Sequence, residues 1–127
     1  MKALLDTHAF LWYLLGDPNL NSKAKEVINT KTGLYFSIAS IWKISIKINI
    51  GKLQLKRPFQ DIPKELQYIN AQLLPITFED TESYLSLPLN HRDPFDRILV
   101  AQAMNHSLVL ISRDSAFDAY SIQRVWL

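Results

Sequence analysis

The segment DPFDRILVAQAMNHSLVLISRD, residues 93–114, contains the pattern that decides the fold. Residues 93–106 predict a helix, with Pro94 in the first turn, where proline is well tolerated. Residues 108–111, LVLI, form an unbroken apolar run that is typical of a buried strand. A helix followed at once by a buried strand is the unit from which helix-covered parallel sheets are built.

The rest of the chain repeats this alternation of short apolar strands and helices. Further strands are expected at residues 2–5, 34–37, 73–76 and 122–126, and further helices at about 7–15, 22–31, 37–51, 58–72 and 78–86. Ser22 is expected to cap the second of these helices, and Gly51 to end the third. The alternation predicts an α/β fold with a mainly parallel central sheet sandwiched by helices.

Length and composition favour a single compact domain over residues 1–127. The chain is 48% hydrophobic and 20% charged, so it can bury a core and is not disordered. It has no cysteine, which excludes disulfides, thiolate zinc sites and cysteine nucleophiles. The formal net charge of +2 permits a nucleic-acid partner without arguing for one. No segment is long enough to span a bilayer or resembles a secretory signal, so we expect a cytoplasmic protein with no membrane partner.

Four aspartates are expected to lie at one edge of this sheet. Asp6 directly follows the first strand, Asp114 follows the LVLI strand by three residues, and Asp93 and Asp96 open the helix before it. Ligands of parallel sheets bind beyond the carboxyl ends of the strands. Neighbouring carboxylates repel one another unless a cation lies between them, and Mg²⁺ and Mn²⁺ prefer carboxylate and water. The pattern therefore suggests a metal site for phosphodiester cleavage.

Each of these aspartates also has a purely structural interpretation. Asp6 could cap the helix that follows it, and Asp114 could cap a short turn at residues 115–117. Asp93 and Asp96 have the spacing of a capping box. For any one of them alone capping is the more common role, and only their gathering at one edge favours a metal.

Four motifs together resemble PIN-domain ribonucleases, and more closely the VapC-type toxins of bacterial toxin–antitoxin systems. They are LLDTHAFLW (4–12), SIASIWKISIK…GKL (37–53), HRDPFDRILVAQA (91–103) and LISRD (110–114). The resemblance covers nearly the whole chain and implies a PIN-like fold. It also implies an endoribonuclease that depends on Mg²⁺ or Mn²⁺ and acts on cellular RNA. Such toxins are usually homodimers, and a VapB-like antitoxin neutralises them by placing its tail in the active site.

The resemblance also implies roles for individual residues. The catalytic, metal-binding acids of the family match Asp6, Asp96 and Asp114, with Asp93 as an additional metal ligand. The hydroxyl groups that would orient the acids or metal-bound water are those of Thr7 and Ser112. The candidates for contacts with RNA phosphates, for which a solvated or ion-paired surface role is the alternative, are Arg92, Arg97 and Arg113.

Lys43 departs from the family pattern. Similar toxins have tryptophan, glutamate and isoleucine in this helix, whereas this chain has Trp42, Lys43 and Ile44. A charged lysine has no acceptor and cannot ligate Mg²⁺. If it points into the site, we expect it to pair with Asp6 or Asp96 and to weaken metal binding. On residue type alone, its stem could instead lie along the helix with the amine in solvent.

Three interpretations of Lys43 follow from the sequence. The protein could be an attenuated or inactive member that still binds RNA or antitoxin, it could stay active with Asp93 replacing the lost ligand, or the lysine could be a detoxifying substitution. The sequence predicts a VapC-like endoribonuclease attenuated by Lys43, and the alternative is a catalytically silent PIN-fold protein that binds antitoxin or RNA. A phosphatase or receiver-like domain phosphorylated on Asp6 is less favoured, because no second acid stands two residues further on.

Overall fold

The computed structural model describes residues 2–30, 33–89 and 93–126. Its strands are β1 (Ala3–Leu5), β2 (Leu34–Ser37), β3 (Ala71–Leu74), β4 (Val109–Ile111) and β5 (Arg124–Val125). Its helices are α1 (Thr7–Leu15), α2 (Ser22–Thr30), α3 (Ile38–Asn49), α4 (Ile62–Tyr68), α5 (Phe78–Leu85) and α6 (Pro94–His106). Two short 3₁₀ helices are η1 (Phe59–Asp61) and η2 (Ser115–Ala119).

The five strands form one sheet in the order β3-β2-β1-β4-β5, and all neighbouring pairs are parallel. The chain extends the sheet from β1 first through β2 and β3, then crosses to the other side of β1 to add β4 and β5. The order therefore reverses between β1 and β4. In open α/β sheets this is the place where ligands bind.

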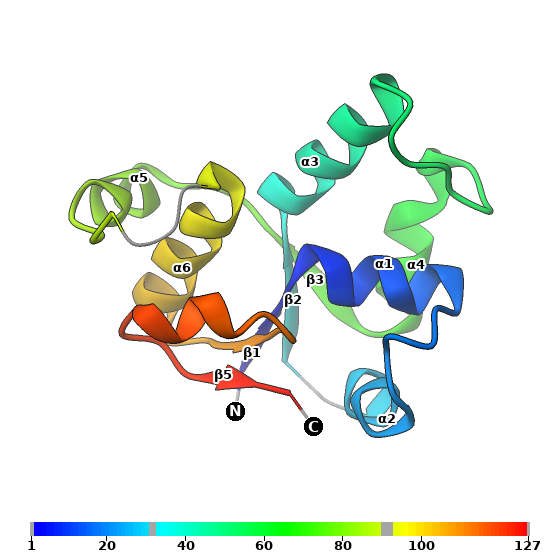
Figure 1. The fold of residues 1–127 in the computed structure, drawn as a ribbon, viewed down its shortest axis with the longest axis horizontal. Helices are drawn as coiled ribbons and strands as arrows, with labels where there is room; N and C mark the ends of the chain where they lie inside the picture. The colour runs from blue at the N-terminus through cyan, green and yellow to red at the C-terminus, as the bar shows by residue number, and fades with distance from the viewer. Residues whose placement is uncertain (1, 31–32, 90–92, 127) are drawn as a thin grey trace.

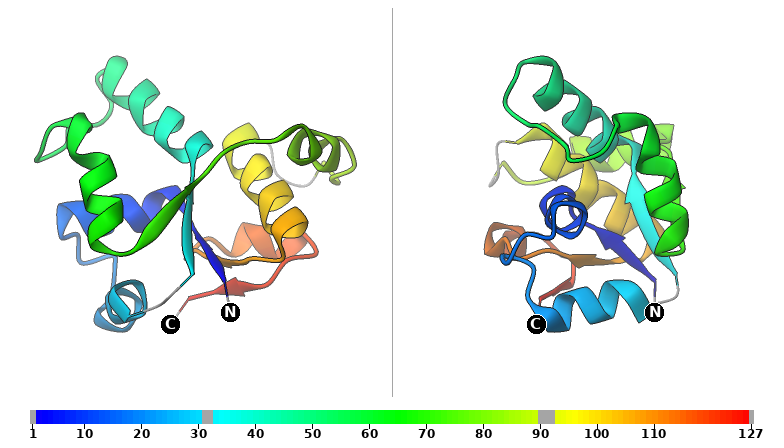
Figure 2. Two further views of the ribbon diagram at one scale, coloured as in Figure 1. Left: turned by 180° about the vertical axis from the view of Figure 1, so that it is seen from behind. Right: turned by 90° about the vertical axis from the view of Figure 1, so that its right-hand side faces the viewer.

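Helices cover both faces of the sheet (Figures 1 and 2). Because side chains alternate along a strand, Leu5 and Ile111 face one core with α1, α2 and α4, while Leu4 and Leu110 face another with α6 and η2. Helix α5 packs on α6. The predicted α/β fold with a helix-sandwiched parallel sheet is confirmed. In the described part of the chain, no helix combines the length and apolar character needed to cross a membrane.

The region between α3 and β3 differs from its prediction. In place of one helix over residues 58–72, the structure has η1 followed by the shorter α4. The chain then turns at Asn70, whose φ of 56° is left-handed, and β3 begins two residues earlier than expected. Asparagine is one of the few residues that adopt this conformation readily, so the turn needs no glycine.

Two helix ends test the capping predictions. The cap of α2 is Asn21 and not Ser22, because the Asn21 side chain accepts a 2.8 Å hydrogen bond from the backbone N–H of Ala24. Helix α3 ends at Asn49, and Gly51 follows with a left-handed φ of 75°, as expected for a glycine that ends a helix.

The last strand, β5, is also shorter than the predicted 122–126.

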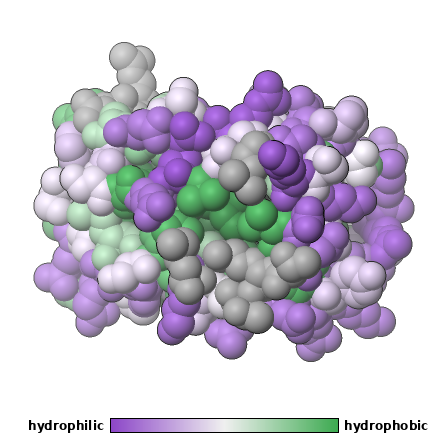
Figure 3. All heavy atoms as spheres, turned by 90° about the horizontal axis from the view of Figure 1, so that it is seen from below, coloured by the Kyte–Doolittle hydropathy of each residue, from purple (hydrophilic) through white to green (hydrophobic). Residues whose placement is uncertain are grey.

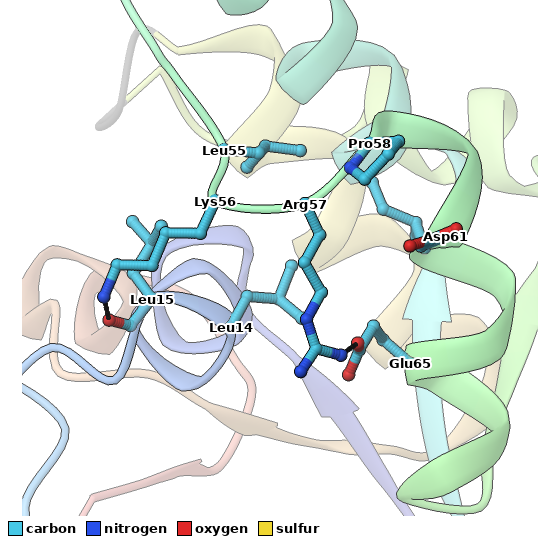
Figure 4. Close-up of a pocket in the computed structure, with 9 residues that line it drawn as sticks. Leu14, Leu15, Leu55, Lys56, Arg57, Pro58, Asp61 and Glu65 are labelled. Atoms are coloured by element: carbon cyan, nitrogen blue, oxygen red, sulfur yellow. Dashed lines mark hydrogen bonds and ion pairs between the residues drawn. The ribbon is translucent and has the colours of Figure 1, made fainter.

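A segment between α3 and η1 lies against the carboxyl end of α1 (Figure 4). Lys56 Nζ donates to the carbonyl oxygen of Leu15 at 2.9 Å, and Arg57 forms an ion pair with Glu65 of α4. A lysine suits this position, because the last carbonyls of a helix lack partners within the helix. The small hollow enclosed here shares no residue with the acidic cleft described below.

The view from below shows apolar residues in the middle of one face, surrounded by hydrophilic ones (Figure 3). A small apolar hollow between α2 and β5 is lined by Ala24, Val27, Ile111, Val125 and Trp126. Its lining is apolar, so it offers none of the groups expected at the predicted metal site.

Candidate active site

Asp6 lies directly after β1, beside the point where the strand order reverses. Its side chain is buried, with 4% of the residue exposed, and its Oδ2 accepts a 2.9 Å hydrogen bond from the hydroxyl of Ser112. Its Oδ1 is also buried and accepts no hydrogen bond from any residue that the structure describes. Asp6 stands at the cap position of α1, but its side chain makes no capping bond to that helix, so the capping interpretation is wrong here.

The environment of Asp6 is unfavourable for a lone carboxylate. Burial raises the pKa of Asp6, and the charge of Asp114 adds to the rise. The Ser112 hydrogen bond, the backbone amide of Thr7 and the charge of Lys43 oppose it. A buried carboxylate with one unpaired oxygen lacks the partners that normally offset its desolvation. A positive charge placed at Oδ1 would supply one.

Ser112 connects Asp6 to Asp114. Its hydroxyl donates to Asp6 and accepts a 3.0 Å hydrogen bond from the backbone N–H of Asp114. Asp114 is exposed and caps η2, because its Oδ1 accepts from the N–H of Ala116 at 2.9 Å. The predicted turn cap is confirmed for Asp114. Asp6 and Asp114 also line one open cleft, of about 390 Å³.

Thr7 and Ser40 fix the starts of α1 and α3 against each other. Both are buried, and the Thr7 hydroxyl donates to the Ser40 hydroxyl at 2.6 Å. The sequence analysis did not single out Ser40. A signal was available, because Ser40 lies three residues before Lys43 and therefore on the same face of the helix.

Lys43 points to the start of α6. Its Nζ lies 2.8 Å from Oδ2 of Asp93, and the two side chains are 12% and 30% exposed. The expected ion pair with Asp6 or Asp96 is therefore corrected to one with Asp93, and the solvent-directed alternative is wrong. The physical reason is that Asp93 caps α6, which places its carboxylate against α3, where these helices are in contact.

Both carboxylate oxygens of Asp93 have partners. Oδ1 accepts from the backbone N–H groups of Phe95 at 2.8 Å and Asp96 at 3.4 Å, and Oδ2 accepts from Lys43. Burial raises the pKa of Asp93, but the hydrogen bond and charge of Lys43 and these two amides outweigh it, so the net shift is downward. This geometry disfavours the interpretation in which Asp93 replaces the missing ligand.

Asp96 lies half-buried in the first turn of α6, and its charge reaches the same space as the other acids. His8 reports this. Burial lowers the pKa of His8, Lys47 and Lys43 lower it further, and Asp96 and Asp114 act in the opposite direction. The starts of α1, α3 and α6 therefore surround one region in which acids and lysines oppose each other (Figures 1 and 2).

The three arginines differ in what they can contact. Arg97 is 5% exposed, and its guanidinium donates to the carbonyl of Pro88 at 2.7 Å, so the predicted phosphate contact is wrong for this residue. Arg113 is exposed and lines the cleft, where it donates to the Asn19 side chain at 2.9 Å. Arg92 lies outside the described residues.

The fit of a divalent cation depends on few groups. Within residues 2–30, 33–89 and 93–126, no three carboxylate, histidine or cysteine side chains are placed to hold a metal ion together. Mg²⁺ is often held by only one or two carboxylates and several waters. Asp6, with its unpaired Oδ1, and Asp114 on the same cleft fit that need. The charge of Lys43, on α3, acts on Asp6 and lowers its pKa, so it opposes a cation at that carboxylate.

Replacing Asp6 with asparagine is expected to stabilise the fold. The change removes a buried charge that lacks a full set of partners, which is worth about 1 kcal/mol at neutral pH. Urea unfolding measures the difference. Asp114→Asn is the matched control, because Asp114 is exposed and asparagine caps equally well. Equal or lower stability of Asp6→Asn would contradict the unfavourable environment assigned to this carboxylate.

Comparison with known proteins identifies the family of this chain. A model of the PIN domain family matches residues 3–123, so the chain belongs to the PIN domain family. A search of curated proteins found no match.

Solved structures share the fold over almost their whole length. VapBC2 from Rickettsia felis, bound to a DNA fragment from its promoter, has a TM-score of 0.72 at 14% identity, with 98% of each chain covered. FitAcB from Neisseria gonorrhoeae has a TM-score of 0.70 at 16% identity, covering 98% of this chain and 96% of the other. A toxin–antitoxin complex from Klebsiella pneumoniae has a TM-score of 0.67 at 17% identity, covering 98% and 97%. At these identities the likeness concerns the fold.

Proposed function

We propose that this chain is a VapC-like toxin, an endoribonuclease that uses Mg²⁺ or Mn²⁺ to cleave cellular RNA and that is attenuated by Lys43. The observation that carries the proposal is the buried carboxylate of Asp6, with its unpaired Oδ1, next to Asp114 at the reversal of strand order. Membership of the PIN domain family supports it, as does the shared fold with proteins solved as toxin–antitoxin complexes.

In this proposal Asp6 and Asp114 would hold the cation, with Asp96 in support. When bound, the ion would supply positive charge to the scissile phosphate and lower the pKa of an attacking water. Ser112 holds the Asp6 carboxylate and the backbone of Asp114 in place. The hydroxyl contact of Thr7 keeps α1 against α3, and Arg113 is available at the cleft for a phosphate.

The attenuation follows from charge. Lys43 lies close enough to lower the pKa of Asp6, so its ammonium favours that carboxylate without a metal. It also engages Asp93, which we proposed as an additional ligand. Both effects oppose the binding of a cation.

We also propose a VapB-like antitoxin as partner, a homodimeric state and a cytoplasmic location. The support for the antitoxin is that structures with the same fold are toxin–antitoxin complexes. The alternative function is a catalytically silent PIN-fold protein that binds antitoxin or RNA. The Lys43–Asp93 ion pair favours this alternative, since it engages an acid that could otherwise help to hold a cation.

RNA cleavage with Mg²⁺, Mn²⁺ or EDTA tests the proposal. We expect slow cleavage by the unmodified chain, its loss in EDTA, and its loss in Asp6→Asn and in Asp114→Asn. Asp118→Asn is the control, because Asp118 is an exposed acid that pairs with Arg124 and does not line the cleft. Cleavage that survives EDTA or Asp6→Asn would overturn the metal-dependent mechanism. Absence of cleavage in both the chain and Lys43→Glu, with antitoxin binding retained, would support the silent protein.

A further inference from the structure

We propose that Trp12 is a stacking surface for one unpaired base of an RNA strand at the acidic cleft, with Arg113 beside it for that nucleotide's phosphate. The inference rests on the proposed function and deepens it. It names the side chain on which a base of the bound RNA would stack, a role that the acids of the cleft cannot fill.

The cleft places these groups side by side. Its lining consists of Asp6, His8, Trp12, Arg113, Asp114 and Ser115. The volume of about 390 Å³ lies in the range of sites that hold small ligands, so a nucleotide can enter it. An aromatic ring and a guanidinium therefore share one hollow with the two acids that would act on a phosphodiester.

Trp12 is held in position before any ligand arrives. Its ring packs edge-on against Trp126 and lies near His8, with both ring centroids 6.0 Å away. Its backbone carbonyl accepts a 2.9 Å hydrogen bond from Asp17, which fixes the end of α1. A ring that is already ordered loses little entropy when a base stacks on it.

The guanidinium of Arg113 lies over the ring of Trp12. Its Cζ lies 6.0 Å from the ring centroid, at the far limit of a cation–π contact. One guanidinium nitrogen donates to Asn19, which keeps the side chain near the ring. A base that stacks on this face of Trp12 would move the guanidinium outward, where it can contact the phosphate of that nucleotide.

Beside Trp12, the charge of Arg113 favours a nucleotide over a cationic peptide segment. An acidic cleft with an aromatic wall would also suit an arginine or lysine side chain, but Arg113 would repel a cation that approached Trp12. Base stacking is tolerant of sequence, because every base has a π face. The geometry thus points to recognition of an unpaired nucleotide without selection of a particular base.

Binding of short single-stranded RNA, measured by fluorescence anisotropy in EDTA at low salt, tests this assignment without cleavage. We expect Trp12→Leu to weaken binding on the order of tenfold, and Trp12→Phe to restore most of it. Trp42→Leu is the matched control, since Trp42 is 60% exposed and does not line the cleft. A series of oligonucleotides, each lacking one base at a different position, identifies the base that stacks. Removing that base should weaken binding to the unmodified chain about tenfold. Removing the same base should not weaken binding to Trp12→Leu, which has already lost the stacking surface.

The abasic series separates stacking from a structural role, because a misfolded variant cannot depend on one base of its ligand. The assignment is overturned if Trp12→Leu and Trp42→Leu lose affinity equally, or if no abasic position matters to the unmodified chain. It is also overturned if Trp12→Leu weakens binding of an arginine-containing peptide and leaves RNA binding unchanged. If RNA binds Trp12→Leu as tightly as the unmodified chain, the stacking assignment is wrong, but the proposed nuclease function is not contradicted. Absence of RNA binding and of cleavage, in the chain and in Lys43→Glu, would overturn both.

Discussion

Replacing Lys43 with glutamate is expected to tighten Mn²⁺ binding by about ten- to a hundredfold and to raise metal-dependent RNA cleavage. The change removes the ammonium that pairs with Asp93 and places a carboxylate on α3 in its stead. At about 4 Å and an effective dielectric near 20, each unit-charge contact is worth roughly 4 kcal/mol before desolvation and side-chain entropy reduce it. Calorimetric titration with Mn²⁺ and a cleavage assay measure the two effects.

The same substitution is expected to make stability depend on the metal. In EDTA, Lys43→Glu should unfold at a lower temperature than the unmodified chain, because Asp93 loses its partner and gains a like charge. Mn²⁺ should restore the lost stability by binding the folded state. Thermal unfolding with and without Mn²⁺ distinguishes this from a general loss of packing.

Two variants isolate the cause of the Lys43→Glu effect. Lys43→Met removes the charge without supplying a ligand and should give only part of the gain. Lys47→Glu makes the same change in charge one turn further along α3 and should give less still. If Lys43→Glu leaves Mn²⁺ binding and cleavage unchanged while Asp6→Asn abolishes cleavage, the placement of Lys43 at the metal site is wrong.

Replacing Asp80 with alanine is expected to cost about 3 kcal/mol of unfolding free energy. Asp80 is fully buried and joins α5 to α6. Its carboxylate accepts from the backbone N–H of Thr77 at 2.9 Å, from Asn105 at 3.0 Å and from Gln102 at 3.4 Å. Alanine removes the capping box of α5 and leaves the backbone N–H of Thr77 without its partner, while Gln102 keeps its bond to the Pro75 carbonyl. Urea unfolding measures the loss, and Glu79→Ala, an exposed acid of the same first turn, is the control.

Asp80 also gives an acid dependence to stability. Burial raises its pKa, but the hydrogen bonds from Thr77, Asn105 and Gln102 outweigh it, and the net shift is below the ordinary value of 3.8. For an acid with a lowered pKa in the folded state, the stabilisation is present above the unfolded pKa and is lost as the pH falls below it. The difference in unfolding free energy between the chain and Asp80→Ala should therefore shrink below about pH 4. A difference that stays constant down to pH 2 would contradict this.

The sequence predicts α1 and α6 almost to the residue. For α6, apolar periodicity, a proline in the first turn and a following buried strand agree, and α1 directly follows the buried strand β1. The sequence places β3 two residues too late, because only Leu74 of that strand is buried. An edge strand with exposed residues lacks the apolar run that identified β4, and the turn at Asn70 carries no glycine or proline.

Part of the candidate site also follows from the sequence. Leu5 pairs with Ile111 in the sheet, so Asp6 and Ser112 come next on adjacent parallel strands and must meet. The partner of Lys43 does not follow, because the choice among three aspartates depends on which one caps α6. The burial of Arg97 does not follow either, because charge alone predicts exposure, whereas its guanidinium lies over the ring of Tyr84 in α5.

The hydroxyl of Ser112 fixes the direction of a hydrogen-bond chain from Asp114 to Asp6. The amide of Asp114 donates to it, and it donates in turn to Oδ2 of Asp6, so its single hydrogen is already used. A proton taken up by Asp6 without breaking this chain must go to Oδ1, the oxygen left unpaired. A divalent cation would take the same atom. A proton and the proposed cation then compete for one oxygen, so acid is expected to weaken any binding of a cation there.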